Sequence, residues 1–438
     1  MDARIPWLIL CLGFSARAAA QVEDSYTPRA LPGLRTRMRK VKFTSLRLAA
    51  LQLDLAVEDG SNVIALDNWG DNYAGLAHEV KTKLQVLYGR DEITDDTDSP
   101  AKRSFPGLYY SQTLGNCLGA FEVEGLSDNL SRDYLTLDKP SAAAAFGAAS
   151  GNLLAGIGGG LAREEDSYRV DVNFYDLHDY DNRELVAGLG YVIPFQESSL
   201  TLGADGGVHY FQRYYEANYG SDRTDTEDLK GPKYGFQAIL KTAQGVLGAR
   251  YLHQAIQGRY SSTYYSYNSS YGISSDTIHF DEEIGHEELE ARWFRKFEDI
   301  PFNFGMDWMR TIDTTRDSAQ DRSDSWGAGL TWRIDTAALL GVEYRNSNNY
   351  DYIKTTSIST GIEFPVFERM RLRFSYRDIK SKYRWGWTEL YRTGAAGVGY
   401  KLGESSRLDG VLSRTINDPS YGYKGIENFL NLQLNFYF

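Results

Sequence analysis

The sequence predicts an all-β fold: a transmembrane antiparallel up-and-down β-barrel of about 20 strands, with 16 or 18 as alternatives. Three observations predict it. Apolar and polar residues alternate over many stretches of roughly ten residues, the length that a tilted strand needs to cross a bilayer. Short and long connections between these stretches alternate as well. Finally, Tyr (31), Phe (20) and Gly (42) are abundant while Pro (11) is scarce. Apart from an apolar run near the N-terminus, no apolar stretch approaches the length of a membrane helix.

The C-terminal stretch shows the alternation most clearly. Leu430, Leu432 and Leu434 alternate with Asn and Gln, and the chain ends on Phe438. A strand with one face toward lipid and one toward a wet lumen requires this pattern. A half-buried edge strand of a soluble sheet has it too, so this stretch alone decides nothing. The same period recurs at residues 396–402, 370–376, 358–364, 326–332, 302–308, 234–240 and 168–174.

The connections between these stretches predict an orientation. Every second one is short, at residues 403–405, 365–368, 335–336, 297–301, 242–245 and 195–198. The intervening ones are longer, at residues 415–423, 379–386, 346–352, 311–324, 258–285 and 212–232. Membrane barrels alternate short periplasmic turns with long extracellular loops in this way, whereas a soluble sandwich or propeller has no reason to keep the phase. We therefore expect both termini in the periplasm.

The N-terminal third alternates less regularly. Leu51, Leu53, Leu55 and Val57 predict one further strand, and residues 80–88 predict its partner. Residues 105–114 and 117–125 predict another pair, and 16 strands are predicted from Ser141 onward. The strand number falls to 18 or 16 if one or both of these early pairs form a plug instead.

The N-terminus predicts export. A charged start, an apolar run over residues 5–14 and an Ala-x-Ala ending at Ala20 are the parts of a cleaved signal peptide, expected over residues 1–20. Residues 21–44 hold six Arg and Lys residues and are expected to form a basic periplasmic segment. A single barrel is then expected over residues 45–438.

The signal peptide, the alternating strands and the C-terminal Phe438 together resemble those of porin-like outer-membrane β-barrel proteins of Gram-negative bacteria. The resemblance implies an integral outer-membrane location and contact with outer-membrane lipid and lipopolysaccharide. It also implies insertion by the barrel-assembly machinery, which recognises a C-terminal strand of this kind.

No motif for an enzyme or for nucleic-acid binding stands out. The glycine-rich residues 156–160 lack the strand-to-helix context of a phosphate loop, and we interpret them as small residues that let neighbouring side chains or a plug approach closely. The net charge of -12 is unfavourable for nucleic acid. We expect no enzymatic activity, no cofactor and no nucleic-acid partner.

One predicted strand carries a row of arginines on its lumen-facing phase, opposite in parity to Leu372, Phe374 and Tyr376. Glu363, on the inward phase of the preceding strand, is placed to pair with the second of them. The predicted lumen-lining set is Arg369, Arg371, Arg373, Arg377, Glu363, Glu343, Arg345 and Arg333. Two interpretations stay open: a mixed-charge network that rigidifies the wall and fills the interior, or a charged constriction that selects permeants.

The longest predicted loop ends in a charge-rich stretch. His279, Asp281 and His286 are weak candidates for a divalent-cation site, because imidazole and carboxylate groups suit such ions. Their spacing matches no specific site, and a solvated, charged loop end gives the same composition.

The predicted function is a porin-like channel for small polar or charged solutes. One alternative is a scaffold that sheathes a periplasmic or extracellular partner such as a multihaem cytochrome. Another is an exporter of an acidic polysaccharide, for which a net-positive lumen is expected.

Overall fold

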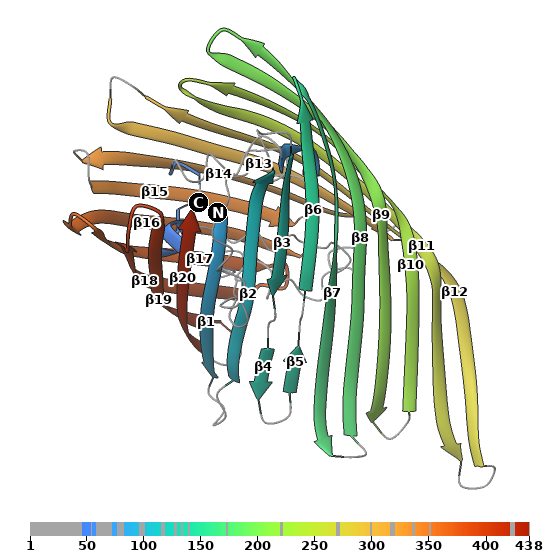
Figure 1. Ribbon diagram of the computed structural model, residues 1–438. Helices are drawn as coiled ribbons and strands as arrows, with labels where there is room; N and C mark the ends of the chain where they lie inside the picture. The colour runs from blue at the N-terminus through green and yellow to red at the C-terminus, as the bar shows by residue number, and fades with distance from the viewer. Residues whose placement is uncertain are drawn as a thin grey trace, which may run out of the picture.

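The computed structural model describes residues 46–53, 55–57, 72–76, 83–95, 101–114, 119–126, 129–132, 135–138, 141–171, 174–219, 222–268, 272–297, 300–315, 320–334, 338–349, 352–420 and 425–437. Most of these residues lie in one antiparallel sheet of 20 strands, which curves around an interior (Figure 1). The expected signal peptide (1–20) and basic segment (21–44) lie outside the described residues.

The first half of the sheet comprises β1 (Lys83–Asp95), β2 (Ala101–Leu114), β3 (Gly119–Leu126), β4 (Asn129–Arg132), β5 (Leu135–Asp138), β6 (Ser141–Ser150), β7 (Leu153–Asp171), β8 (Phe174–Phe195), β9 (Ser198–Tyr219) and β10 (Asp222–Thr242). The second half comprises β11 (Gly245–Asn268), β12 (Gly272–Lys296), β13 (Phe302–Thr315), β14 (Gln320–Ile334), β15 (Ala338–Asn349), β16 (Ile353–Phe367), β17 (Met370–Tyr383), β18 (Thr388–Lys401), β19 (Ser406–Pro419) and β20 (Gly425–Tyr437).

The strands pair in sequence order, and the first strand pairs with the last: β1 and β20 are in register from Lys83–Tyr437 to Asp95–Gly425. Strands β3 and β4 both lie against β2, and β5 and β6 both lie against β7. Counting each of these two interrupted strands once reduces the 20 strands to 18 around the circumference. The predicted all-β antiparallel, barrel-like fold is confirmed.

Alternate residues face opposite sides of the sheet, as strand geometry requires. On β8, Leu185 and Leu189 are 53% and 58% exposed, whereas their neighbours Glu184 and Val186 are buried. Similar exposed apolar side chains, including Leu247, Leu330, Leu340, Ile358 and Leu412, recur on strand after strand and form an apolar belt on the outer surface. Exposed apolar surface of this extent is rare on soluble monomers. Among the described residues, no helix is long and apolar enough to span a membrane.

The hairpins β8–β9, β10–β11 and β16–β17 turn at one end of the sheet, here called the turn end, with two residues between strands in each case. The opposite end, here called the loop end, differs from the prediction. The expected loops at residues 212–232 and 258–285 are largely paired strand, with Asp228 opposite Gln212 and Tyr264 opposite Asp276. Their Tyr, Ser and Thr residues suit strands, and pairing satisfies the backbone polar groups.

The wall is therefore uneven in height. Strands β8 to β12 contain 21 to 25 residues, whereas β13 to β20 contain 12 to 15. The surplus lies at the loop end, because β13 pairs with β12 only from Ile284 to Lys296. We call the loop-end parts of β8 to β12 the extended wall (Figure 1).

The predicted strand over Leu51 to Val57 is wrong. Residues Leu46–Leu51 form helix α3, and the chain continues irregularly through the residues that follow. Leu51, Leu53 and Val57 are buried in one cluster with Leu339 of β15. Four apolar residues at every second position also suit an irregular segment that is enclosed on several sides, so the pattern misled. Its predicted partner is confirmed over residues 83–88, which lie in β1.

Candidate functional site: the inner wall and the lumen segment

Residues 46–53 and 55–57, here called the lumen segment, lie against the inner face of the sheet. Helix α3 contacts β16 to β20, and the residues after it reach β13 to β15 (Figure 1). Leu48, Leu51 and Val57 are 4%, 0% and 0% exposed. The segment is thus packed on the barrel interior rather than built into the wall.

Glu363 of β16 is the centre of the contact between wall and segment. Its carboxylate accepts from Nε and Nη2 of Arg47 at 2.9 Å each, from Nη1 of Arg371 at 2.9 Å and from Nε of Arg373 at 2.7 Å. Nη1 of Arg373 donates to Asp409 at 2.8 Å. Glu363 and Arg373 are fully buried. Arg47 makes a bidentate pair, the strongest geometry for an arginine and a carboxylate.

The wall also satisfies the C-terminal carbonyl groups of α3, which have no partner inside a helix. The Ser375 hydroxyl donates to the Ala50 carbonyl at 2.7 Å, and Nη2 of Arg377 donates to the Gln52 carbonyl at 2.8 Å. Gln52 ends the helix in the left-handed region, with φ of 52°. Arg377 is held by Ser359, which accepts from its Nε at 2.7 Å.

The irregular end of the lumen segment is bonded to β14 and β15. The Leu55 amide donates to Glu343 at 3.1 Å, and the Thr331 hydroxyl donates to the Ala56 carbonyl at 2.8 Å. Arg345 holds Glu343 in place, with 2.7 Å from its Nε to the carboxylate, and also donates to Asp307 at 2.9 Å.

Glycines on the inner face make this close approach possible. A Cβ at Gly305 would overlap the Leu55 carbonyl, and one at Gly361 would lie 2.5 Å from the Leu51 carbonyl oxygen. Both distances are shorter than any real Cβ contact, so these strands accept the segment only with glycine. Gly327, Gly329, Gly341 and Gly397 lie against the same segment.

A second part of the N-terminal chain lies against the far wall. The 3-10 helix η1 (Tyr73–Gly75) contacts β6, β7 and β8. The Asn72 amide donates to the carbonyls of Leu189 and Ala204 at 3.0 and 3.2 Å. Tyr73 fills the space left by Gly156 and Gly158, which confirms that this glycine-rich stretch allows the close approach of a plug. We call residues 72–76 the second lumen segment.

The structure brings together six of the eight predicted lumen residues. Arg371, Arg373, Arg377, Glu363, Glu343 and Arg345 line the inner wall at or beside the lumen segment, and the predicted pair of Glu363 and Arg371 is confirmed. Arg369 is a correction, because it lies in the β16–β17 turn and not on the wall. Arg333 is on β14 near the turn end, apart from the cluster.

Sequence reasoning missed the other half of the contact. Arg47 and Asn72 carry no local signal, because their partners are more than 100 positions away in the sequence. Asp409, which binds Arg373, shares the inward parity of β19 and could have been added on that basis. The inward-facing glycines on β13 to β18 were a further signal of a chain packed inside.

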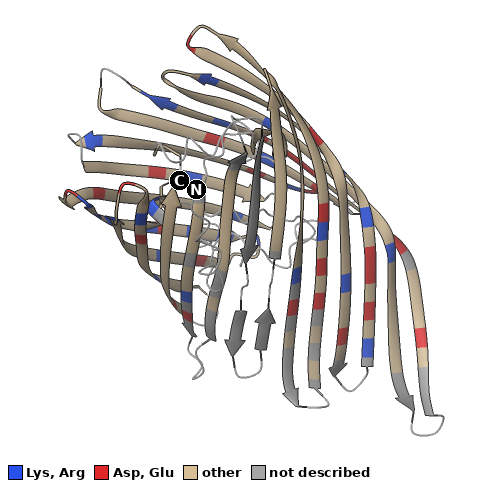
Figure 2. Cartoon of the chain, viewed as in Figure 1, with Lys and Arg blue, Asp and Glu red and all other residues tan. Residues whose placement is uncertain are grey.

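The inner wall away from the lumen segment is also a network of both charges. Arg250 pairs with Glu288 and with Glu290, the latter at 3.0 Å, and Arg292 pairs with Glu290 at 2.6 Å. Lys233 pairs with Glu184 at 2.9 Å, and both are buried. Figure 2 shows both charges along the long strands. The mixed-charge network is therefore present.

The weak metal candidates are separated. His279 and Asp281 occupy the outward phase of β12, whereas His286 faces inward and lies 2.6 Å from Asp313. In the described part of the chain, no three His, Cys, Asp or Glu side chains come together as a metal site.

Comparison with known proteins gives only distant similarities. No protein-family model and no curated protein matches the chain. Among solved structures, a mutant of the monoaromatic hydrocarbon channel TodX is 12% identical over 88% of this chain and 96% of its own, with a TM-score of 0.40. A structure of the Pseudomonas putida toluene transporter TodX is also 12% identical, over 88% of this chain and 96% of its own, with a TM-score of 0.39.

Two further structures are a transporter and a receptor. The copper transporter OprC is 11% identical, with a TM-score of 0.49, and the match covers 78% of this chain but 62% of OprC. The siderophore receptor PiuA from Acinetobacter baumannii is 8% identical over 82% of each chain, with a TM-score of 0.42. Similarity at this level carries no conclusion about what this chain transports or binds.

Proposed function

We propose that the chain is an outer-membrane channel whose lumen is closed by its own N-terminal residues, and that it conducts when the lumen segment leaves the wall. The observation that carries the proposal is the cluster around Glu363, where Arg47 of the lumen segment joins two arginines of the wall on one buried carboxylate. A segment held by ion pairs and hydrogen bonds can detach without unfolding the sheet, because none of the strand ladders depends on it.

The outer surface supports insertion into a membrane. The apolar belt alternates with a polar inner wall on the same strands, which is the arrangement of a membrane barrel and the reverse of a soluble one. In the outer membrane, the turn end would face the periplasm and the extended wall would project from the cell.

The finer proposal is that small polar or charged solutes pass. Its support is the inner wall, where buried Glu184, Lys233, Arg250 and Glu290 would face a permeant once the lumen segments have moved. An apolar permeant would meet charged rather than apolar side chains at these four positions of the inner wall. Sheathing of a partner and export of an acidic polysaccharide stay predictions of the sequence, with no observation in their favour.

Planar-bilayer recording of the refolded chain tests the proposal. We expect small, infrequent currents from the native chain, because the lumen segment is bound. Arg47→Glu places a carboxylate against Glu363, and we expect frequent large openings. Deletion of residues 46–76 should give a continuously open channel. Arg310→Glu is the matched control, since Arg310 pairs with Asp324 on the outer face and should leave the currents unchanged.

Two results would contradict the proposal in different ways. Large steady currents from the native chain, unaffected by Arg47→Glu, would show that the lumen segment closes nothing. An absence of current from every variant, including the deletion, would show that the barrel is not a channel.

A further inference from the structure

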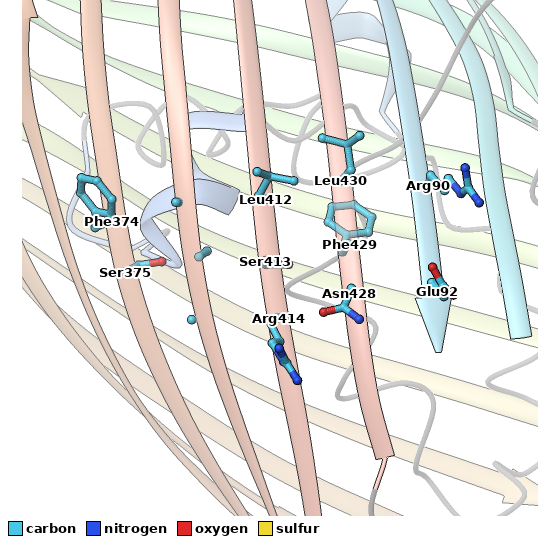
Figure 3. Close-up of a pocket in the computed structure, with 13 residues that line it drawn as sticks. Arg90, Glu92, Phe374, Ser375, Leu412, Ser413, Arg414, Asn428, Phe429 and Leu430 are labelled. Atoms are coloured by element: carbon cyan, nitrogen blue, oxygen red, sulfur yellow. The ribbon is translucent and has the colours of Figure 1, made fainter. Parts of the chain in front are cut away.

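The outer face of the sheet is hollowed where β17, β18, β19, β20 and β1 lie side by side (Figure 3). The cavity has a volume of about 580 Å³ and opens to the outside. Figure 3 views it with helix α3 behind the strands, so the hollow is on the side away from the lumen segment. It is therefore a separate feature from the inner wall.

Two neighbouring rows of outward side chains form the hollow. Toward the turn end, the register aligns Phe374, Ala396, Leu412, Leu430 and Arg90 across the five strands. One step toward the loop end, it aligns Tyr376, Gly394, Arg414, Asn428 and Glu92. The small residues of β18 leave the gap, and a Cβ at Gly394 would meet no atom within 4 Å.

The two rows differ in chemistry. Phe374 and Leu412 are 45% and 59% exposed, and with Leu430 they belong to the apolar belt. Arg414 and Asn428 lie about 7 Å further along the strands and end the belt at this point. Arg90 stands in the apolar row, where a long arginine side chain directs its charge out of the apolar layer toward polar groups.

The two arginines of the hollow are not neutralised by carboxylates of described residues. Neither Arg90 nor Arg414 forms an ion pair with any described residue. Glu92 is the one carboxylate in the lining, against these two arginines. Their backbone positions are two strands apart, roughly 10 Å across the sheet, so both guanidinium groups can reach one headgroup.

The surrounding outer face carries more basic than acidic residues on this side of the barrel, and more acidic than basic residues on the extended wall. Outward residues beyond the belt on β16 to β18 include Lys354, Lys380, Lys382 and Arg392. On the extended wall the corresponding outward residues are mostly acidic: Asp179, Asp181, Glu216, Asp228, Asp281, Glu283 and Glu287, against the basic Arg183, Lys230 and Arg259. An anionic headgroup is therefore attracted to the hollow and repelled from the opposite side.

We propose that the hollow binds a phosphate-bearing acyl lipid of the outer leaflet, with its phosphate on Arg90 and Arg414 and an acyl chain across Phe374, Leu412 and Leu430. This proposal rests on the proposed function in one respect, because it needs the loop end to face the outer leaflet. The charge and the depth of the hollow match such a lipid: apolar contacts lie inside the belt, and the cations lie at its edge, where headgroups begin.

The test measures lipid binding to the full-length chain, refolded in a zwitterionic detergent, by native mass spectrometry. The probes are lipid A with two phosphates, phosphatidylcholine, and inorganic phosphate. We expect lipid A to stay bound and phosphatidylcholine to be lost. The double variant Arg90→Gln/Arg414→Gln removes two charge-assisted contacts and should weaken lipid A binding by at least about tenfold. Gly394→Leu places a side chain in the hollow, where its Cβ meets no atom within 4 Å, and should weaken lipid A binding as well.

Arg183→Gln/Arg259→Gln on the opposite side is the control, because it removes the same charge outside the hollow and should leave lipid A binding unchanged. Equal retention of lipid A and phosphatidylcholine, or unchanged binding by the double variant and by Gly394→Leu, would overturn the proposal. Displacement of lipid A by an equal concentration of inorganic phosphate would assign the arginines to free phosphate and overturn it too.

The outcome is independent of the channel experiment. Binding is measured in detergent and needs no current, so a chain that never conducts but retains lipid A refutes the channel and leaves the lipid site standing. A chain that conducts but retains lipid A and phosphatidylcholine equally supports the channel and refutes the lipid site.

Discussion

The buried side chains around Glu363 determine how much stability a single substitution in this cluster removes. Four arginines (Arg47, Arg371, Arg373, Arg407) surround two carboxylates (Glu363, Asp409), so the cluster already carries more positive than negative charge. Glu363 contacts three of the arginines. It is therefore the residue on which both the wall and the lumen segment depend.

Glu363→Gln should destabilise the fold by about 3–5 kcal/mol, because it leaves the buried guanidinium group of Arg373 short of its carboxylate. Urea unfolding in micelles measures the loss. Arg371→Gln is the comparison, since that side chain is 43% exposed and the pair is worth about 1 kcal/mol or less. Equal losses in the two variants would show that burial does not govern the cluster.

The extended wall contains one carboxyl group with a displaced titration. Burial and the neighbouring Glu282 carboxylate raise the pKa of Glu227 to about 8, against the opposing effect of Arg213. Glu227 lies on β10 beyond the apolar belt, next to outward Thr226 and Asp228. A raised pKa in the folded state means that folding takes up a proton between the ordinary value of 4.5 and about 8.

The expected consequence is a loss of stability as pH rises. The contribution of Glu227 is complete below pH 4.5 and is lost as pH passes through 8. Glu227→Gln should flatten this dependence of the melting temperature, measured by circular dichroism from pH 5 to about 9. Glu283→Gln removes an exposed, outward carboxylate of β12 and serves as the control. A native chain with no loss of stability over this range would contradict the assignment.

At the scale of single elements, the strands were the predictable part. Period-two alternation in the sequence predicts that Glu363 of β16 and Arg371 of β17 share the inner face and pair, since parity decides the face of each side chain. Helix α3 was not predictable in this way. Its six residues are too few for a helical period, and Leu51, Leu53, Leu55 and Val57 fit a strand equally well. It is held by Glu363 and Ser375, which bind Arg47 and the Ala50 carbonyl and are distant in sequence.

The fit of an element to the wall can be tested through Gly305. The Cβ of Gly305→Ala would overlap the Leu55 carbonyl, so residues 55–57 must move away. Overpacking of this kind costs about 1–3 kcal/mol, which would raise the ratio of open to closed channels roughly 5- to 150-fold. Single-channel recording gives that ratio. Gly206→Ala faces outward with its nearest neighbour at 3.9 Å and should leave it unchanged. An unchanged ratio in Gly305→Ala would show that the lumen segment does not control channel opening.

At the scale of the whole molecule, two asymmetries coincide. The outward residues beyond the belt are mostly acidic on the tall side of the barrel, β8 to β12, and mostly basic on the short side, β16 to β18. The overall net charge of -12 conceals this division. With the loop end in the outer leaflet, as proposed, a tall acidic wall would stand clear of anionic headgroups, whereas a short basic edge would be held close to them. The orientation of the barrel in its membrane would follow from this distribution.

Insertion itself is tested by a pair of lysines on the same side of the barrel. Leu189 lies in the middle of the apolar belt on β8, 58% exposed, and Leu189→Lys should cost about 2–4 kcal/mol in bilayers because lipid solvates the ammonium group poorly. Thr226→Lys, on the outward phase of β10 beyond the belt, should cost close to nothing because water reaches it. Reversible unfolding from phosphatidylcholine vesicles gives both values. In detergent the difference should shrink, since micelles adapt around a charge. Two equal costs in vesicles would mean that the exposed leucines do not face lipid, and that the belt must be covered by something else.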